Sequence, residues 1–140
     1  ILQAVDQLKA RSDMDIHLNY ALKDVPLSPS EEIHLLQIMR EASQNATNHS
    51  QGKNLKISLF QHENKNIELV IKDDGIGLPK SPEKLNHYGL AIIKERSRHL
   101  NATLSVNSTP ENDVEHGNTE IKLQFKPSYL IEQNNNVHEH

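Results

Sequence analysis

The stretch LKISLFQHENKNIELVIKDDGIG, at residues 55–77, contains two runs in which apolar and polar residues alternate, followed by two aspartates and two glycines. Alternation with a period of two is typical of β-strands, and the polar residues ENKN between the runs predict a hairpin. An ordinary turn needs one aspartate or one glycine. The cluster DDGIG therefore suggests a second role at the end of the second strand.

The hydrophobic pattern on both sides of this hairpin predicts further elements. We expect a short amphipathic helix at residues 1–11, a strand at 15–22, a long helix from 30 to about 50, a second helix at 89–100 and strands at 102–108 and 118–126. Ser30 is the predicted N-cap of the long helix. The apolar positions of that helix are predicted to be Ile33, Leu36, Ile38, Met39, Ala42 and Ala46.

The order strand, helix, hairpin, helix, hairpin predicts the fold class. We expect an α/β two-layer sandwich, in which a mixed, mostly antiparallel sheet of about five strands carries about three helices on one face. The 140 residues are enough for one domain with its own core, at residues 1–127. Residues 128–140 have no pattern and are expected to form a disordered tail.

Composition excludes several classes of function. The formal net charge of -4 gives no support to a general nucleic-acid-binding role. The absence of cysteine excludes a disulfide framework, a thiolate zinc site and a cysteine nucleophile. No apolar run approaches the roughly 20 residues that a membrane-spanning helix needs. The chain begins with Ile1, so we expect it to be part of a longer protein.

A polar stripe follows the predicted long helix. Glu41, Asn45 and Asn48 are four and three residues apart, so they share one face beside the apolar stripe. An asparagine oxygen there could ligate Mg²⁺, and a glutamate one turn earlier could orient a water molecule or accept a proton. An ordinary solvated helix face is the alternative interpretation.

The Asp-Gly cluster has the residue types that adenine recognition needs. Asp73 could accept a hydrogen bond from the exocyclic amino group of a purine, while Gly75 and Gly77 would let the backbone approach a flat ring. The alternative is a glycine-rich turn with Asp74 as its Asx residue.

Gly89 opens the second helix, where free N–H groups favour phosphate. Neither the P-loop pattern nor the dinucleotide pattern G-x-G-x-x-G is present.

Four motifs, taken together and in order, resemble the ATP-binding domain of sensor histidine kinases in the GHKL or Bergerat superfamily. REASQNATNHS resembles the N box, DDGIG the first glycine box, HYGL the second glycine box and GNTEIKLQF the terminal strand. The N box and NHYGLAIIKERSRHL are most similar to the nitrate/nitrite sensor kinases. The resemblance covers residues 18–125, most of the chain.

The resemblance implies a role for each motif residue. Glu41 would be the general base or orienting carboxylate beside the γ-phosphate, Asn45 would ligate the Mg²⁺ that bridges the ATP phosphates, and Asp73 would accept the adenine amino group. Residues 78–87 would form a short ATP lid. The other implied ATP-binding residues are His49 toward phosphate or ribose, Gly75 and Gly77 under the base, Thr119 supporting it through a water molecule, and Gly89 and Leu90 over the phosphates.

The resemblance also implies partners and a location. The protein would be a protein-histidine kinase that transfers the γ-phosphoryl of Mg-ATP to a histidine on its own dimerisation domain, from which a response regulator receives it. The parent protein would be a homodimeric bacterial inner-membrane sensor, with this domain in the cytoplasm.

The sequence departs from the subfamily in three ways. Asn48 stands where Lys is usual, Asn118 interrupts the usual Gly-Thr pair, and no segment resembles the helix that carries the phosphorylated histidine.

Two other functions stay open at this stage. An ATPase module of the same fold would use Glu41 to activate water, and a regulatory module would bind nucleotide weakly and a partner through the free sheet face.

The histidines give no further motif. His17, His34, His62, His99 and His116 form no i, i+4 ligand pair, and we expect solvated or edge histidines that serve neither as metal ligands nor as the phosphoacceptor.

Overall fold

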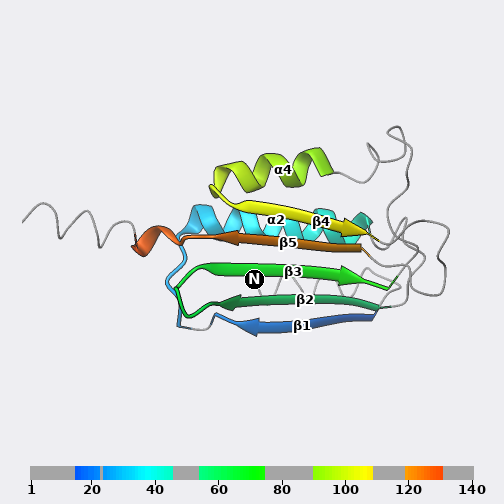
Figure 1. The fold of residues 1–140 in the computed structure, drawn as a ribbon, viewed down its shortest axis with the longest axis horizontal. Coiled ribbons are helices and arrows are strands. Elements are labelled where there is room, and N and C mark those ends of the chain that lie inside the picture. Colours follow the sequence, from blue (N-terminus) through cyan, green and yellow to red (C-terminus); the bar gives the residue numbers. More distant parts are fainter. Residues whose placement is uncertain (1–14, 23, 46–53, 75–89, 109–118, 131–140) are drawn as a thin grey trace, which may run out of the picture.

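The predicted hairpin lies at the centre of a five-stranded sheet (Figure 1). The computed structural model describes residues 15–22, 24–45, 54–74, 90–108 and 119–130. The hairpin consists of β2 (Asn54–Gln61) and β3 (Ile67–Asp73), which are antiparallel as predicted. The other strands are β1 (Asp15–Ala21), β4 (Thr103–Ser108) and β5 (Thr119–Phe125), and the strand order is β1-β2-β3-β5-β4.

Two helices pack against this sheet. Because β1 and β2 are parallel, the chain must cross over between them, and α2 (Pro29–Asn45) forms that connection. The second helix, α4 (Leu90–His99), precedes β4 and contacts both α2 and β4. The remaining strand pairs are antiparallel, which confirms the predicted α/β sandwich with a mixed, mostly antiparallel sheet. The helix predicted at residues 1–11 lies outside the described residues.

The core lies between the sheet and the helices. Alternation places one set of side chains from each strand on the helix-facing side, because successive residues of a strand point to opposite faces. The buried apolar side chains are Ile16, Leu22, Leu35, Ile38, Met39, Ala42, Leu55, Ile57, Leu59, Ile67, Leu69, Ile71, Ile93, Leu100, Ile121, Leu123 and Phe125. They form a single cluster, as expected for one domain.

The start of α2 corrects the predicted N-cap. Ser28 caps the helix instead of Ser30: its Oγ accepts a hydrogen bond from the backbone N–H of Glu31 at 3.1 Å. The carboxylate of Glu31 accepts the backbone N–H of Ser28 in return at 2.8 Å. This reciprocal pair is a capping box, and Pro29 occupies the first helical position, where it loses no hydrogen bond. The structure describes α2 as far as Asn45, so residues 46–50 of the predicted helix are not described.

Ile38, Met39 and Ala42 are buried as predicted, and the buried face of α2 differs from the prediction only near the start of the helix. Ile33 was expected to face the core but is 54% exposed, whereas Leu35, absent from the predicted apolar set, is fully buried. The buried stripe runs through Glu31, Leu35, Ile38 and Ala42, in helical steps of four, three and four. The capping box fixes the carboxylate of Glu31 at the buried edge, so the stripe begins there and not at Ile33.

The residues that directly follow the last strand contact the rest of the domain. Residues 128–130, which the sequence places in the tail, form a helical turn. The backbone N–H and hydroxyl of Ser128 donate to the carboxylate of Glu31, at 2.9 and 3.0 Å. The side-chain amide of Gln61 donates to the hydroxyl of Tyr129 at 2.8 Å. The rest of the predicted tail, residues 131–140, lies outside the described residues.

Candidate functional site

One end of the sheet carries a buried polar pair next to apolar rows of the same face. Asp73, the last residue of β3, lies directly between Leu55 of β2 and Thr119 of β5 in the strand register. Both Asp73 and Thr119 are buried, at 8% and 6% exposure. The two rows behind them on the same face contain isoleucine and leucine from β2, β3 and β5. On this face the strands β3 and β5 therefore change from apolar to polar at the end that carries Asp73 and Thr119.

The register explains how Asp73 and Thr119 come together although 46 residues separate them in the sequence. Directly opposed residues of antiparallel strands have Cβ atoms about 4.5–5.5 Å apart, close enough for one water molecule or one ligand group to contact both. A buried aspartate and threonine at a strand end are thus suited to hold a polar ligand group beside an apolar surface.

The end of α2 supplies the second wall of the site. Glu41 and Asn45 are one turn apart, and both lie on the side of α2 that also carries His34. His34 contacts Arg96 and His99 of α4, so this side of α2 faces α4. Asn45 is buried at 9% exposure and Glu41 is half-buried. Glu41 and Asn45, the two described members of the predicted polar stripe, therefore lie on the side of α2 that faces α4, and neither is fully exposed.

The direction of α4 brings its first residue to the same end. The two helices run antiparallel, because the start of α2 lies beside the end of α4 (Figure 1). From the His34 contact, Glu41 is seven residues along α2, and Leu90 is six residues back from Arg96 along α4. At 1.5 Å per residue both displacements are about 10 Å, so Leu90 comes level with Glu41. The start of β5 and the ends of α2 and β3 lie at this end too.

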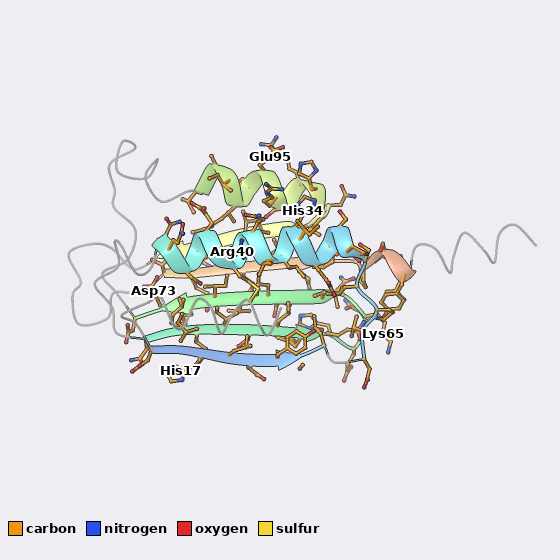
Figure 2. All side chains as sticks on the ribbon, turned by 180° about the vertical axis from the view of Figure 1, so that it is seen from behind. His17, His34, Arg40, Lys65, Asp73 and Glu95 are labelled. Carbon is orange, nitrogen blue, oxygen red and sulfur yellow. The ribbon has the colours of Figure 1, made fainter. Side chains whose placement is uncertain are left out.

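The two aspartates of the opening cluster have different surroundings. Asp74 is exposed, and its carboxylate accepts hydrogen bonds from the backbone N–H and the side-chain amide of Asn54, both at 3.0 Å. Its own backbone N–H donates to the carbonyl of Asn54. Asp74 thus closes the end of the β2–β3 ladder, whereas the glycine turn in which the sequence suggested an Asx role lies outside the described residues. Asp73 is on the opposite, helix-facing side (Figure 2).

The described part of the chain places Glu41, Asn45, Asp73, Leu90 and Thr119 at one end of the sandwich. The other predicted site residues, His49, Gly75, Gly77 and Gly89, lie outside the described residues, as do Asn48 and the predicted lid at 78–87. Their assignments remain predictions from the sequence.

The side-chain oxygen of Asn45 would suit a Mg²⁺ ion whose other ligands are mainly water and phosphate oxygens. Within the described ranges, no group of three or more histidine, aspartate or glutamate side chains could hold a metal ion. Mg²⁺ typically takes one or two protein ligands and completes its shell with water and phosphate oxygens. The buried amide of Asn45, one turn after Glu41, matches that requirement.

Sequence reasoning missed the contact between two histidines. His34 and His99 were expected to be solvated or edge residues, and they are half-buried and exposed, respectively. The sequence did not indicate that their rings stack, with centroids 4.8 Å apart. They are 65 positions apart, on α2 and α4, so no local spacing indicates the contact. Only the packing of α4 against α2 brings them together.

Comparison with known proteins agrees with the fold. The model of the histidine kinase-, DNA gyrase B- and HSP90-like ATPase family matches residues 30–128. The chain belongs to this family. That span contains Glu41, Asn45, Asp73, Leu90 and Thr119, and it ends at Ser128, which bonds to Glu31.

Among its relatives are sensor kinases of nitrate signalling. The chain is 38% identical over 121 residues to a Haemophilus influenzae protein described as a NarQ sensor protein homolog, and these residues cover 86% of the chain. It is 32% identical over 122 residues to the nitrate/nitrite sensor protein NarX of Escherichia coli K12, covering 87% of the chain. The matched region spans only 20% and 19% of those two proteins.

Solved structures agree on the fold. The blue-light activated histidine kinase of Erythrobacter litoralis EL346 superposes with a TM-score of 0.71 at 18% identity, over 90% of this chain and 40% of that chain. The full-length protein ShkA, solved in complex with AMPPNP, superposes with a TM-score of 0.67 at 14% identity, over 89% of this chain and 28% of that chain. In the described part of this chain, no helix is long and apolar enough to cross a membrane.

Proposed function

We propose that this chain is the ATP-binding catalytic domain of a two-component sensor histidine kinase that acts in nitrate or nitrite signalling. The observation that carries the proposal is the buried pair Asp73 and Thr119 at the end of the sheet, on the same end of the sandwich as the end of α2 (Figure 1). Family membership and the relatives described as nitrate/nitrite sensors support it. The parent protein would be a homodimeric inner-membrane sensor with this domain in the cytoplasm.

Each wall of the site would bind a different part of the nucleotide. The carboxylate of Asp73 would accept a hydrogen bond from the adenine amino group, and Thr119 would support that contact through a water molecule. Gly75 and Gly77 would lie under the base. The phosphates would extend toward the start of α4, where Gly89, Leu90 and His49 would contact them and the free N–H groups of the helix favour negative charge.

Phosphoryl transfer would depend on positioning and charge. The bond between the γ-phosphorus and the oxygen shared with the β-phosphate breaks as a bond forms to a nitrogen of the acceptor histidine, and ADP leaves. Glu41 would orient the acceptor or take its proton. Mg²⁺ would neutralise phosphate charge when bound, with Asn45 as its protein ligand. The acceptor histidine belongs to the separate dimerisation domain, and the cognate response regulator would receive the phosphoryl group from it.

Phosphoryl transfer to the dimerisation domain tests this function. Mixed with that domain of the parent protein and with Mg-ATP labelled at the γ-phosphate, the chain is expected to label the domain on histidine. Without the domain, little ATP should be hydrolysed, because the acceptor is missing. Acid-labile label on the dimerisation domain measures the transfer.

Two results would contradict the proposal. Steady ATP hydrolysis by the chain alone, with no labelled histidine, would identify an ATPase module. No increase in the unfolding temperature at about millimolar Mg-ADP would identify a regulatory module, since a ligand stabilises the folded state by RT ln(1 + [L]/Kd).

A further inference from the structure

A cluster of basic side chains joins α2 and α4 at the end opposite the candidate site. The rings of His34 and His99 are nearly parallel, with an angle of 3° between their planes. Nη1 of Arg96 lies 3.4 Å from Nδ1 of His34. Arginine can only donate hydrogen bonds, so Nδ1 of His34 is the acceptor, and a ring that accepts there carries its single proton on Nε2. This contact requires a neutral His34, whose position on α2 is labelled in Figure 2.

The two side-chain groups of α4 that face His34 are either positively charged or can become so by protonation. They are the guanidinium of Arg96 and the imidazole of His99. The carboxylate of Glu95 lies 3.4 Å from Nε2 of His99 and 3.5 Å from Arg98. On α2 itself, Glu31 is one turn before His34, but its carboxylate is bonded to Ser28 and Ser128. Neither acidic group is therefore bonded to His34.

Protonation of His34 would break this arrangement. A proton on Nδ1 would point an N–H group at the N–H groups of Arg96, and the new charge would lie beside a permanent one. Protonation of both rings would add repulsion between stacked cations. In agreement, partial burial and the neighbouring His99 and Arg96 lower the pKa of His34 below the ordinary 6.5.

We propose that His34, His99 and Arg96 form a proton-sensitive joint that holds α4 against α2 when His34 is neutral and loosens when it is protonated. The joint lies at the end of α4, and Leu90 lies at its start, level with Glu41. Loosening would let the start of α4 move relative to Asn45, and nucleotide affinity would fall. This last consequence rests on the proposed function, whereas the joint itself does not.

The direction of the pH effect follows from the lowered pKa. As the pH falls through 6.5, the histidine of the unfolded chain takes up a proton before His34 of the folded chain does. Proton binding then favours the unfolded state. The contribution of His34 to stability is therefore complete above 6.5 and is lost progressively as the pH falls toward the lower pKa of the folded protein.

Titration of the 140-residue chain by NMR tests the joint without any substitution. The imidazole C–H resonances of His34 are expected to titrate with a midpoint below 6.5, and those of His99 should shift over the same pH range because the rings are stacked. A midpoint of 6.5 or higher for His34 would overturn the proposal. So would His99 resonances that do not shift over the pH range in which His34 titrates.

Unfolding of variants provides the second test. The urea midpoint of the wild-type chain should fall between about pH 8 and pH 5, and it should fall clearly less in His34→Gln, which keeps an acceptor for Arg96 but cannot be protonated. His17→Gln is the matched control, because His17 is exposed on β1 and bonds to Asn54, far from the joint in the sheet order. Its midpoint should fall as in the wild type. Equal falls in His34→Gln and the wild type would overturn the proposal.

The Kd of Mg-ADP, measured at both pH values, tests the consequence for the site. Acidification should weaken binding several-fold more in the wild type than in His34→Gln. Equal weakening would show that the joint does not act on the site. Absence of ADP binding at the higher pH in every variant would instead overturn the proposed function, and the joint would still be decided by the NMR and unfolding results.

Discussion

At the scale of single residues, Glu31 joins three parts of the chain. Its carboxylate accepts the backbone N–H of Ser28, which begins α2, and both donors of Ser128, which follows the last strand. It is buried at 7% exposure. A buried carboxylate with this many donors is satisfied only in the folded chain, because both segments must be in place to bond to it.

Replacing Glu31 by Gln is expected to lower the free energy of unfolding by about 1–3 kcal/mol, since one acceptor oxygen becomes an NH₂ group that faces another donor. Urea unfolding measures the loss. Glu32→Gln is the matched control, because Glu32 is exposed on the same turn and should change stability by less than about 0.5 kcal/mol. Similar losses in the two variants would mean that the contacts of Glu31 contribute little.

At the scale of elements, the β2–β3 turn carries an unusual conformation. The backbone of Lys65 has φ of 75°, and its N–H donates to the carbonyl of His62 to close the turn. The left-handed region costs a residue with a Cβ atom about 1–2 kcal/mol of conformational free energy, whereas glycine has no such cost. The polar residues of this turn were predicted from the sequence, but its left-handed position was not, because Asn64 and Asn66 are the residues that usually adopt it.

Lys65→Gly is therefore expected to raise the free energy of unfolding by up to about 1 kcal/mol, as read from thermal or urea unfolding. The control is Lys72→Gly, at an exposed position inside β3, where glycine should lower stability. If both substitutions destabilise the chain, the strain assigned to Lys65 is absent.

At the scale of the whole molecule, local patterns predicted the elements, and long-range packing decided how they meet. Alternation and helical spacing were sufficient for the five strands and for α2 and α4, since each pattern is complete within one segment. Insertion of β5 between β3 and β4 could not be read in this way. That insertion places Thr119 beside Asp73. The same limit applies to the His34–His99 stack and to the bond between Glu31 and Ser128.

For the candidate site, too, local motifs were predicted from the sequence and features that depend on packing were missed. Asp73 and Asn45 were predicted because their motifs are short and ordered, and both prove to be buried at one end of the sandwich. The burial of Leu35 in place of Ile33 was missed, because two overlapping helical periods fit the same sequence and the capping box at Ser28 selects one of them. The predicted positions Ile38 and Ala42 are buried, and Glu41 and Asn45 lie on the side of α2 that carries His34 and faces α4.

The central claim is that Asp73 recognises adenine, and calorimetric titration with Mg-ADP tests it most directly. Asp73→Asn should weaken binding by at least about tenfold, because a hydrogen bond to a charged group contributes about 1.5–3 kcal/mol. Asp74→Asn, at the neighbouring exposed residue, should bind as the wild type does, and the wild type should prefer ADP to GDP, whose base has an acceptor in place of the amino group. A folded Asp73→Asn variant with wild-type affinity for Mg-ADP would contradict the account.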